Sequence, residues 1–306
     1  MAFLLHPRSA AVLAAAPAMR CFRAPDLPEG AVGEQHLYLH HQDGVLHVEV
    51  DEVVELDFPR VAVTRSRTWP HEVVARYTCE EGALGGTDHV LETWTTVPAR
   101  EAASLRPRVE GQVATTVLRL KEALEGGGRP PLEGVAPAIV VPPPVTAPPE
   151  GTRTRMHVSG SGVVACSPDT VMGFLLTPAS AVVIGPHTLR CFRAPDTPVG
   201  AVGEQHVAVS EEDGRLRVEI EEVVELDLPR VAVTRNLTTP GDIRVRYTCE
   251  PRADGGTDYQ QEVWIDVAPG QEQVLRPLFV AETDRAVARI TEVLESGTWV
   301  PGPGAA

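Results

Sequence analysis

The feature that most constrains this chain is a long segment that occurs twice. CFRAPDLPEGAVGEQH, residues 21–36, returns as CFRAPDTPVGAVGEQH, residues 191–206. The similarity extends beyond this motif, because residues 21–97 align without a gap on residues 191–267 and most positions carry the same residue. Solenoid and propeller repeats have periods of roughly 20–50 residues, which is much shorter. The chain is therefore a tandem duplication of a whole domain, and each copy has to bury its own core.

The segment between the copies sets the domain boundaries. We predict one domain over residues 1–126 and a second over residues 152–298, with a Pro/Gly-rich linker over residues 127–151 and a flexible tail over residues 299–306. Proline at the density found in the linker supports neither a helix nor an interior strand. It favours extended segments that act as semi-rigid spacers. A proline-rich docking motif is the alternative interpretation of the same residues.

Composition excludes several classes of partner. The hydrophobic content of 43% and the charged content of 23% are those of a globular protein. The formal net charge of -15 argues against nucleic acid or an anionic membrane surface as partner, because both require a basic face. No apolar stretch approaches the roughly 18 residues needed to span a bilayer. We therefore expect neither nucleic-acid binding nor membrane insertion.

The N-terminal segment and the cysteines bear on the compartment. Residues 1–21 resemble a signal peptide superficially, but their pattern returns inside the chain at residues 172–191, so we interpret them as part of the fold. The five cysteines are odd in number and have no zinc-site spacing. We expect reduced, mostly buried thiols, a cytoplasmic location and no cofactor or metal.

The second copy shows the order of elements most completely. Residues 153–166 alternate weakly and predict a first strand, and two short helical pieces follow, beginning at Ser167 and at Pro178. Runs rich in β-branched residues, separated by turn sequences, then predict further strands. These runs are residues 205–209, 216–226, 231–235, 243–250 and 259–267. Apolar residues at helical spacing predict a long closing helix in both copies, with Pro107 and Pro277 near its start.

These patterns predict an α+β protein with two tandem domains, each a curved antiparallel sheet wrapped on a long C-terminal helix. The element order resembles the helix-grip superfamily, which is the START and SRPBCC group that includes polyketide cyclases and lipid-transfer proteins. The motifs that carry the resemblance are LPEGAVGEQH (27–36) and TPVGAVGEQH (197–206), the hairpins ELDFPR (55–60) and ELDLPR (225–230), and GGTD at 85–88 and 255–258. The resemblance covers most of both copies.

The resemblance implies a hydrophobic cavity between sheet and long helix in each domain, holding a small hydrophobic molecule such as a lipid or polyketide. Some members of the group only bind, whereas others catalyse cyclisation or dehydration. The leading hypothesis is therefore ligand binding, and the alternative is a two-domain polyketide aromatase/cyclase. The ligand and the oligomeric state are left open by the sequence.

The first copy departs from this pattern. It begins in register with about Val171 and so lacks the first strand. An open sheet edge is an aggregation risk, so we expect either a start codon farther upstream or another segment that covers the edge. A third hypothesis follows, in which the first copy has lost its cavity and only supports the second.

Alternation along the strands assigns side chains to faces. Apolar residues between Leu46 and Leu56 share one face, which we expect to line the cavity, and Glu52 interrupts it. If Leu56 pairs with Val61, Glu52 opposes Arg65, close enough for an ion pair. Such a pair is able to orient a ligand carbonyl or hydroxyl. The alternative is a β-bulge at DEVVE, which would turn Glu52 to solvent and leave a surface pair.

The same reasoning supplies the remaining candidate residues. Tyr77 offers a phenolic hydroxyl to the cavity, and Gln35 falls on the inward parity, whereas His36 and His206 are predicted to face solvent. In the aromatase/cyclase alternative, Arg65 or its counterpart Arg235 polarises a carbonyl; no catalytic residue is assigned. The predicted ligand-binding residues in both copies are Gln35, Glu52, Arg65, Tyr77, Gln205, Glu222, Arg235 and Tyr247.

Overall fold

The computed structural model describes residues 1–14, 19–42, 45–68, 72–83, 85–126, 153–239 and 241–299. The chain divides into two compact units, unit 1 (Met1–Val141) and unit 2 (Pro142–Ala306). The predicted linker and all of the predicted tail after Trp299 lie outside the described residues. Within the described ranges, no helix combines the length and the hydropathy needed to cross a bilayer.

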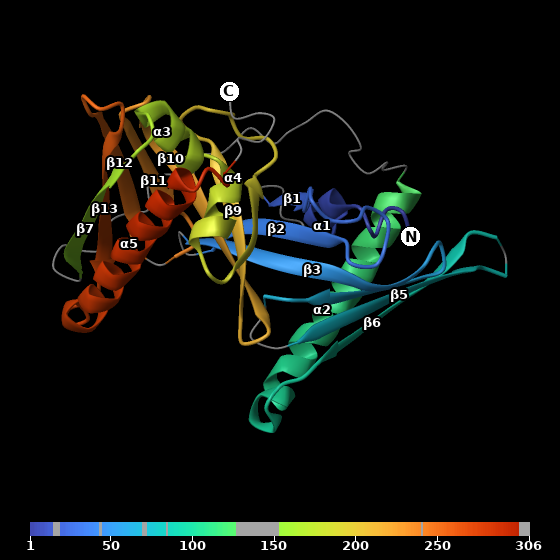
Figure 1. Ribbon diagram of the computed structural model, residues 1–306. Coiled ribbons are helices and arrows are strands. Elements are labelled where there is room, and N and C mark those ends of the chain that lie inside the picture. The colour runs from blue at the N-terminus through green and yellow to red at the C-terminus, as the bar shows by residue number, and fades with distance from the viewer. Residues whose placement is uncertain are drawn as a thin grey trace. The chain divides into compact units, whose positions relative to one another are not determined.

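Unit 2 is an antiparallel seven-stranded sheet with the strand order β7-β13-β12-β11-β10-β9-β8. Its strands are β7 (Thr154–Val164), β8 (Thr188–Arg193), β9 (Gln205–Glu212), β10 (Arg215–Asp227), β11 (Val231–Asn236), β12 (Arg244–Pro251) and β13 (Thr257–Val267). Its helices are α3 (Pro168–Leu175), α4 (Pro178–Ile184) and the long α5 (Glu272–Glu295), which runs across the sheet (Figure 1). Ser167 caps α3 by accepting from the Thr170 N–H, as the sequence predicts.

Two glycines allow α5 to lie close to the sheet. A Cβ atom on Gly160 would come within 3.0 Å of Thr283 Cγ2, and one on Gly162 within 3.0 Å of Val287 Cγ1. The core of unit 2 forms here, where buried Val287 and Ile290 of α5 pack with fully buried Tyr259 of the sheet. Burial of such side chains contributes about 1.5–3 kcal/mol each.

Unit 1 has six strands in the order β1-β2-β3-β4-β5-β6. They are β1 (Arg20–Arg23), β2 (Gln35–Gln42), β3 (Val45–Asp57), β4 (Val61–Ser66), β5 (Val73–Glu81) and β6 (Thr87–Thr95). Helix α1 (Pro7–Ala14) precedes them and the long α2 (Ala99–Glu125) follows and lies along the sheet (Figure 1). In the described part of unit 1 no strand corresponds to β7, so β6 is an edge of the sheet.

The predicted fold class is confirmed, because each unit is a curved antiparallel sheet packed against a long C-terminal helix, which is the helix-grip arrangement. One detail of the prediction is wrong. Pro107 and Pro277 lie inside α2 and α5 and not at their starts, since the helices begin at Ala99 and Glu272. A proline removes one intrahelical hydrogen bond, and in both helices the chain stays helical on either side of it.

Candidate ligand site on the inner face of each sheet

The inner face of each sheet is the face that packs against the long helix. In unit 2, Tyr247 of β12 belongs to the same apolar cluster as Ile290 of α5, which places it on this face. Paired residues on neighbouring strands share a face, and residues two apart on one strand do as well. Tyr247 pairs with Ala232 of β11, so Ala232 and Thr234 also lie on the inner face. Thr234 pairs with Val223 of β10, which puts Val223 and Glu221 on this face. Glu221 in turn pairs with His206 of β9.

A β-bulge decides which residues of β10 point inward. The pairing of β10 with β11 shifts between Val223 and Glu225, and the pairing of β3 with β4 shifts between Val53 and Glu55 in the same way. The extra residue reverses the alternation. Leu226, beyond the bulge, packs against the inner core, whereas Glu222, before it, lies on the outer face.

The bulge also explains the register of the predicted ion pair. Glu52 does pair with Arg65, although Leu56 pairs with Ala62 and not with Val61, because the bulge absorbs the extra residue. Glu52 forms its salt bridge with Arg67, at 2.7 Å between Oε2 and Nη1. Arg65 instead lies 3.2 Å from Glu72.

In unit 2 the predicted pair forms as a contact, with Glu222 Oε2 2.7 Å from Arg235 Nη2. Gln205 Nε2 donates to Glu222 Oε1 over 3.4 Å. All three side chains lie on the outer face. The cavity-facing orientation predicted for Gln35, Glu52, Arg65, Gln205, Glu222 and Arg235 is therefore wrong. The bulge of the alternative is present, but its surface pair is not found in unit 2, because Glu222 and Gln205 are buried. Tyr77 and Tyr247 do lie on the inner face; that these eight residues bind a ligand stays a prediction.

The inner face carries a set of polar side chains that we call the polar row. It crosses four neighbouring strands in each unit, and its members are buried or half-buried. It consists of His36, Asp51, Thr64 and Tyr77 in unit 1, and of His206, Glu221, Thr234 and Tyr247 in unit 2. The imidazole and the carboxyl side chain are directly opposite each other in both units. The row lies between the apolar core on this face and the charged side chains that continue along β3 and β10, such as Glu49 and Glu219.

Burial perturbs the carboxyl groups of the row. Burial, with the nearby charge of Glu49, raises the pKa of Asp51 to about 7. Burial, with the charge of Glu219, also raises the pKa of Glu221. The pKa of Tyr77 rises to about 12, because of burial and the neighbouring Asp51. Near neutral pH, Asp51 is therefore able to hold or release a proton beside a protonated phenol.

The histidine of the row is held by the repeated motif itself. In unit 2, Glu204 accepts hydrogen bonds from His206 Nε2 at 2.7 Å, from Arg193 Nε and from the Gly200 N–H. Burial alone would raise the pKa of Glu204, but these bonds lower it to about 2. In unit 1, Glu34 binds His36 Nε2 at 2.6 Å.

The prediction that His36 and His206 face solvent is therefore wrong. His36 is 2% exposed, and both imidazoles lie on the inner face with a carboxylate partner. The motif CFRAPDxPxGAVGEQH supplies the arginine, the glycine, the glutamate and the histidine of this network. Each copy of the motif therefore forms a hydrogen-bonded loop that holds one imidazole in place.

Part of the inner face is only partly covered. Helix α5 packs mainly against β7, and farther across the sheet the inner-face residues Ala208, Val245, Tyr247 and Gln261 stay half-buried. These side chains flank the polar row of unit 2. Apolar and polar side chains therefore lie together here with partial access, and small-molecule sites use both kinds of group.

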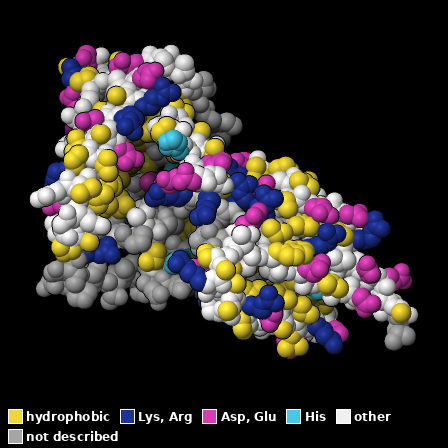
Figure 2. All heavy atoms as spheres, turned by 90° about the horizontal axis from the view of Figure 1, so that it is seen from below, with side chains coloured by type: hydrophobic (Ala, Val, Ile, Leu, Met, Phe, Trp, Pro, Cys, Tyr) yellow, Lys and Arg dark blue, Asp and Glu magenta, His cyan; other side chains and the backbone are white. Residues whose placement is uncertain are grey.

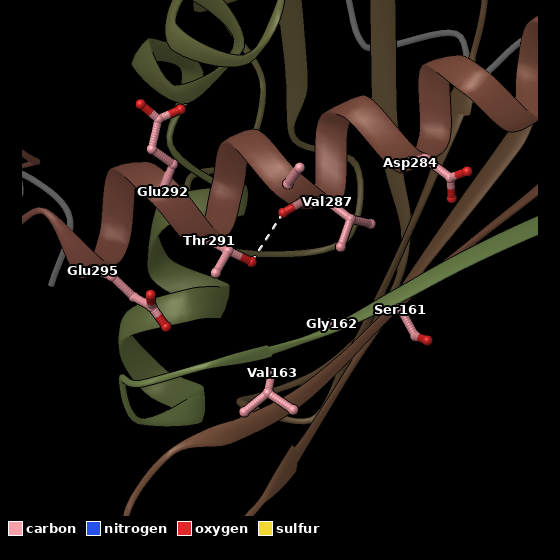
Figure 3. A pocket seen from close by; sticks show the side chains of 9 residues that line it. Ser161, Gly162, Val163, Asp284, Val287, Thr291, Glu292 and Glu295 are labelled. Carbon is pink, nitrogen blue, oxygen red and sulfur yellow. Dashed lines mark hydrogen bonds between the residues drawn. The ribbon is translucent and has the colours of Figure 1, made fainter.

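A separate open groove lies between β7 and α5 (Figure 3). Its wall includes Ser161, Gly162 and Val163 of the strand, and the helix contributes apolar Val287 together with acidic side chains. No residue of the polar row lines this groove. Among the residues that the structure describes, no group of three or more His, Cys, Asp or Glu side chains is placed to hold a metal ion.

The prediction missed the carboxyl and imidazole members of the polar row because it assumed an unbroken inward–outward alternation along the whole of β3 and β10. The doublet Val53-Val54, between acidic neighbours, was the available signal, since two successive apolar residues interrupt an alternating strand. Had the faces been assigned from Tyr77 through the paired strands, and not by alternation from Leu46, Asp51 would have been placed on the inner face.

No family model matches the sequence, and no curated protein matches it. Among solved structures, the chain is similar to the di-domain ARO/CYC StfQ from the steffimycin biosynthetic pathway, with 11% identity over 92% of this chain and 89% of that chain and a TM-score of 0.40. The Zhui aromatase/cyclase from Streptomyces sp. R1128 matches with 15% identity over 49% of this chain and 99% of its own, with a TM-score of 0.40. A START superfamily protein from Mycobacterium smegmatis matches with 17% identity over 46% and 97%, with a TM-score of 0.38.

Proposed function

We propose that each unit binds a small, largely apolar molecule that carries a carbonyl or hydroxyl group, on the inner face of its sheet. The observation that supports this proposal is the protonatable carboxyl of the polar row, Asp51 or Glu221, on the same face as a tyrosine and the apolar side chains of the core. Apolar walls supply most of the binding free energy of such ligands, and a few polar groups fix their orientation.

The surface and the thiols agree with a small molecule as partner. Acidic and basic side chains are interleaved over the face seen in Figure 2, and the net charge of -15 disfavours a polyanionic partner. All five cysteines are free, which supports the cytoplasmic location that we include in this proposal.

Glu221→Ala tests the polar part of the site. The probes are 1-tetralone, an apolar ketone, and N-phenyl-1-naphthylamine, an apolar fluorophore without a carbonyl. Losing one hydrogen bond costs about 1 kcal/mol, so the Kd of 1-tetralone for unit 2 should rise about 5-fold while the Kd of the fluorophore stays nearly unchanged. Fluorescence titration and competition measure both.

The matched control is Glu225→Ala, on the same strand but on the outer face, where Glu225 pairs with Arg246 at 3.3 Å. It should leave both Kd values unchanged. Equal weakening by the two variants would contradict the proposed site, and wild-type protein that binds neither probe would contradict the proposed function.

A second candidate function is acid–base catalysis, in the form of a polyketide aromatase/cyclase. The observation that favours it is the pKa of Asp51, which burial raises to about 7. A group with a pKa near the working pH is the most effective proton donor or acceptor. Arg65 and Arg235, the residues expected to polarise a carbonyl, lie on the outer face in salt bridges, so this candidate depends on the polar row.

A further inference from the structure

Unit 1 carries one inner-face group that unit 2 lacks. Tyr38 follows His36 by two residues on β2 and so shares its face, and its hydroxyl lies 3.3 Å from His36 Nδ1. His36 Nε2 lies 2.6 Å from Glu34. The three side chains form a continuous carboxylate–imidazole–phenol chain, and its imidazole belongs to the polar row.

The protonation states give this chain a direction. Burial alone would raise the pKa of Glu34, but hydrogen bonds from His36 and Arg23 lower it, so Glu34 is ionised. Burial lowers the pKa of His36, so the ring is neutral. Its single proton is on Nε2, donated to Glu34, and Nδ1 accepts from the Tyr38 hydroxyl. No described residue donates to the phenol oxygen, so this oxygen is able to accept from a ligand.

We propose that Tyr38 is the proton acceptor of a reactive site in unit 1, with Asp51 of the neighbouring strand as proton donor, and that it enolises a ligand ketone. This inference rests on the proposed function. His36 and Glu34 act through Tyr38 and are positioning residues. Asp51 is directly opposite His36 in the pairing of β2 with β3, which puts donor and acceptor on adjacent strands of one face.

The proposed step balances. A C–H bond next to the ligand carbonyl breaks, and its proton goes to the phenol oxygen of Tyr38 as the phenol's own proton passes to His36 Nδ1. The electron pair of the C–H bond forms the carbon–carbon double bond of the enol. The carbonyl oxygen takes the proton of Asp51, which becomes a carboxylate, and Glu34 stabilises the imidazolium.

Unit 2 lacks the end of this chain. Ala208 occupies the position of Tyr38, while Glu204 and His206 keep the first link at 2.7 Å. The chain in unit 2 stops at the imidazole, so the duplication has produced one unit with the phenol and one without it. We therefore assign enolisation to unit 1 and binding alone to unit 2.

Tyr38→Phe in the full chain tests the assignment. Exchange of the α-hydrogens of 1-tetralone into D2O, followed by NMR, reports enolisation. Proton transfer by a positioned group contributes about 100-fold or more, so Tyr38→Phe should slow the protein-dependent exchange about 100-fold while the Kd of 1-tetralone stays within about 2-fold. Glu225→Ala, outside both sites, should exchange like wild type.

A second measurement follows the chain without any turnover. The ¹⁵N shift of His36 Nδ1 should change in Tyr38→Phe because the hydrogen bond from the phenol is lost, while the shifts of His206 stay as in wild type. An unchanged His36 shift would overturn the chain. Binding of 1-tetralone without accelerated exchange in wild type, or equal loss of binding and exchange in Tyr38→Phe, would overturn the catalytic role and leave the binding function standing. Failure of wild type to bind 1-tetralone would instead contradict both.

Discussion

Asp51 and Glu221 occupy equivalent positions and differ by one methylene group. In unit 1 the shorter Asp51 lies near the large Tyr38. In unit 2 the longer Glu221 lies near the small Ala208, so the change in one side chain offsets the change in the other. Burial raises the pKa of both carboxyl groups. A carboxyl group whose ionised form is disfavoured in the folded state lowers stability at the pH where it must ionise.

The sign of this effect gives a prediction for Asp51→Asn. The pKa of an unfolded aspartate is about 3.9, whereas burial raises the pKa of Asp51 to about 7. Between these values the folded state binds the proton more tightly, so wild type loses stability as the pH rises from about 4 to about 7. Asp51→Asn lacks this loss, and its thermal midpoint should exceed that of wild type at pH 8 but not at pH 4. Calorimetry at both pH values measures the difference, and a pH-independent offset would contradict the raised pKa.

At the scale of elements, the position of α5 depends on the lack of side chains on β7. Gly160 and Gly162 both lie under the helix, with Thr283 and Val287 in the space that a Cβ would need. Close packing of a helix on a strand requires such small residues, because a packed core has no spare volume. The β-bulge of β10 is the other decisive local feature, since it separates the inner polar row from the outer ion pairs.

Gly160→Val should therefore push α5 away from β7. Overpacking costs about 1–3 kcal/mol, so the free energy of unfolding of unit 2 should fall by that amount in urea denaturation. Ser159→Val, at the neighbouring exposed position on β7, places the same valine side chain outside the groove beside α5. It should change stability by less than about 0.5 kcal/mol. Equal effects of the two variants would show that α5 does not rest on Gly160.

At the scale of the whole molecule, the two units differ in how much of the long helix they bury. Helix α2 has one buried residue, Leu120, among its described residues. Helix α5 has five, including Ile290 and Val287. The sheet of unit 2 also has seven strands, against six in the described part of unit 1. A smaller buried core supplies less stability, so unit 1 should be the less stable unit.

We predict two thermal transitions, with unit 1 unfolding first. Leu120→Ala should lower the first midpoint temperature and Ile290→Ala the second. Each substitution should lower the free energy of unfolding of its unit by about 2–5 kcal/mol, as large-to-small core substitutions do. Differential scanning calorimetry of the full chain with the two matched variants measures this. A single transition that both variants shift equally would show that the units unfold as one.

The sequence by itself determined the duplication, the order of the elements and the fold class, because β-branched runs, turn residues and helical periodicity are local signals that recur in both copies. The pairing of Glu52 with Arg65 was predicted correctly although the predicted hairpin register is one residue off, because the β-bulge compensates for that shift. Only the tertiary structure decided which face each residue occupies. One extra residue at Val53-Val54 reverses the alternation, and burial of His36 depends on a carboxylate brought to it by the preceding loop. The motif that marks the duplication in the sequence is therefore, in the folded chain, the loop that fixes an imidazole on the inner face.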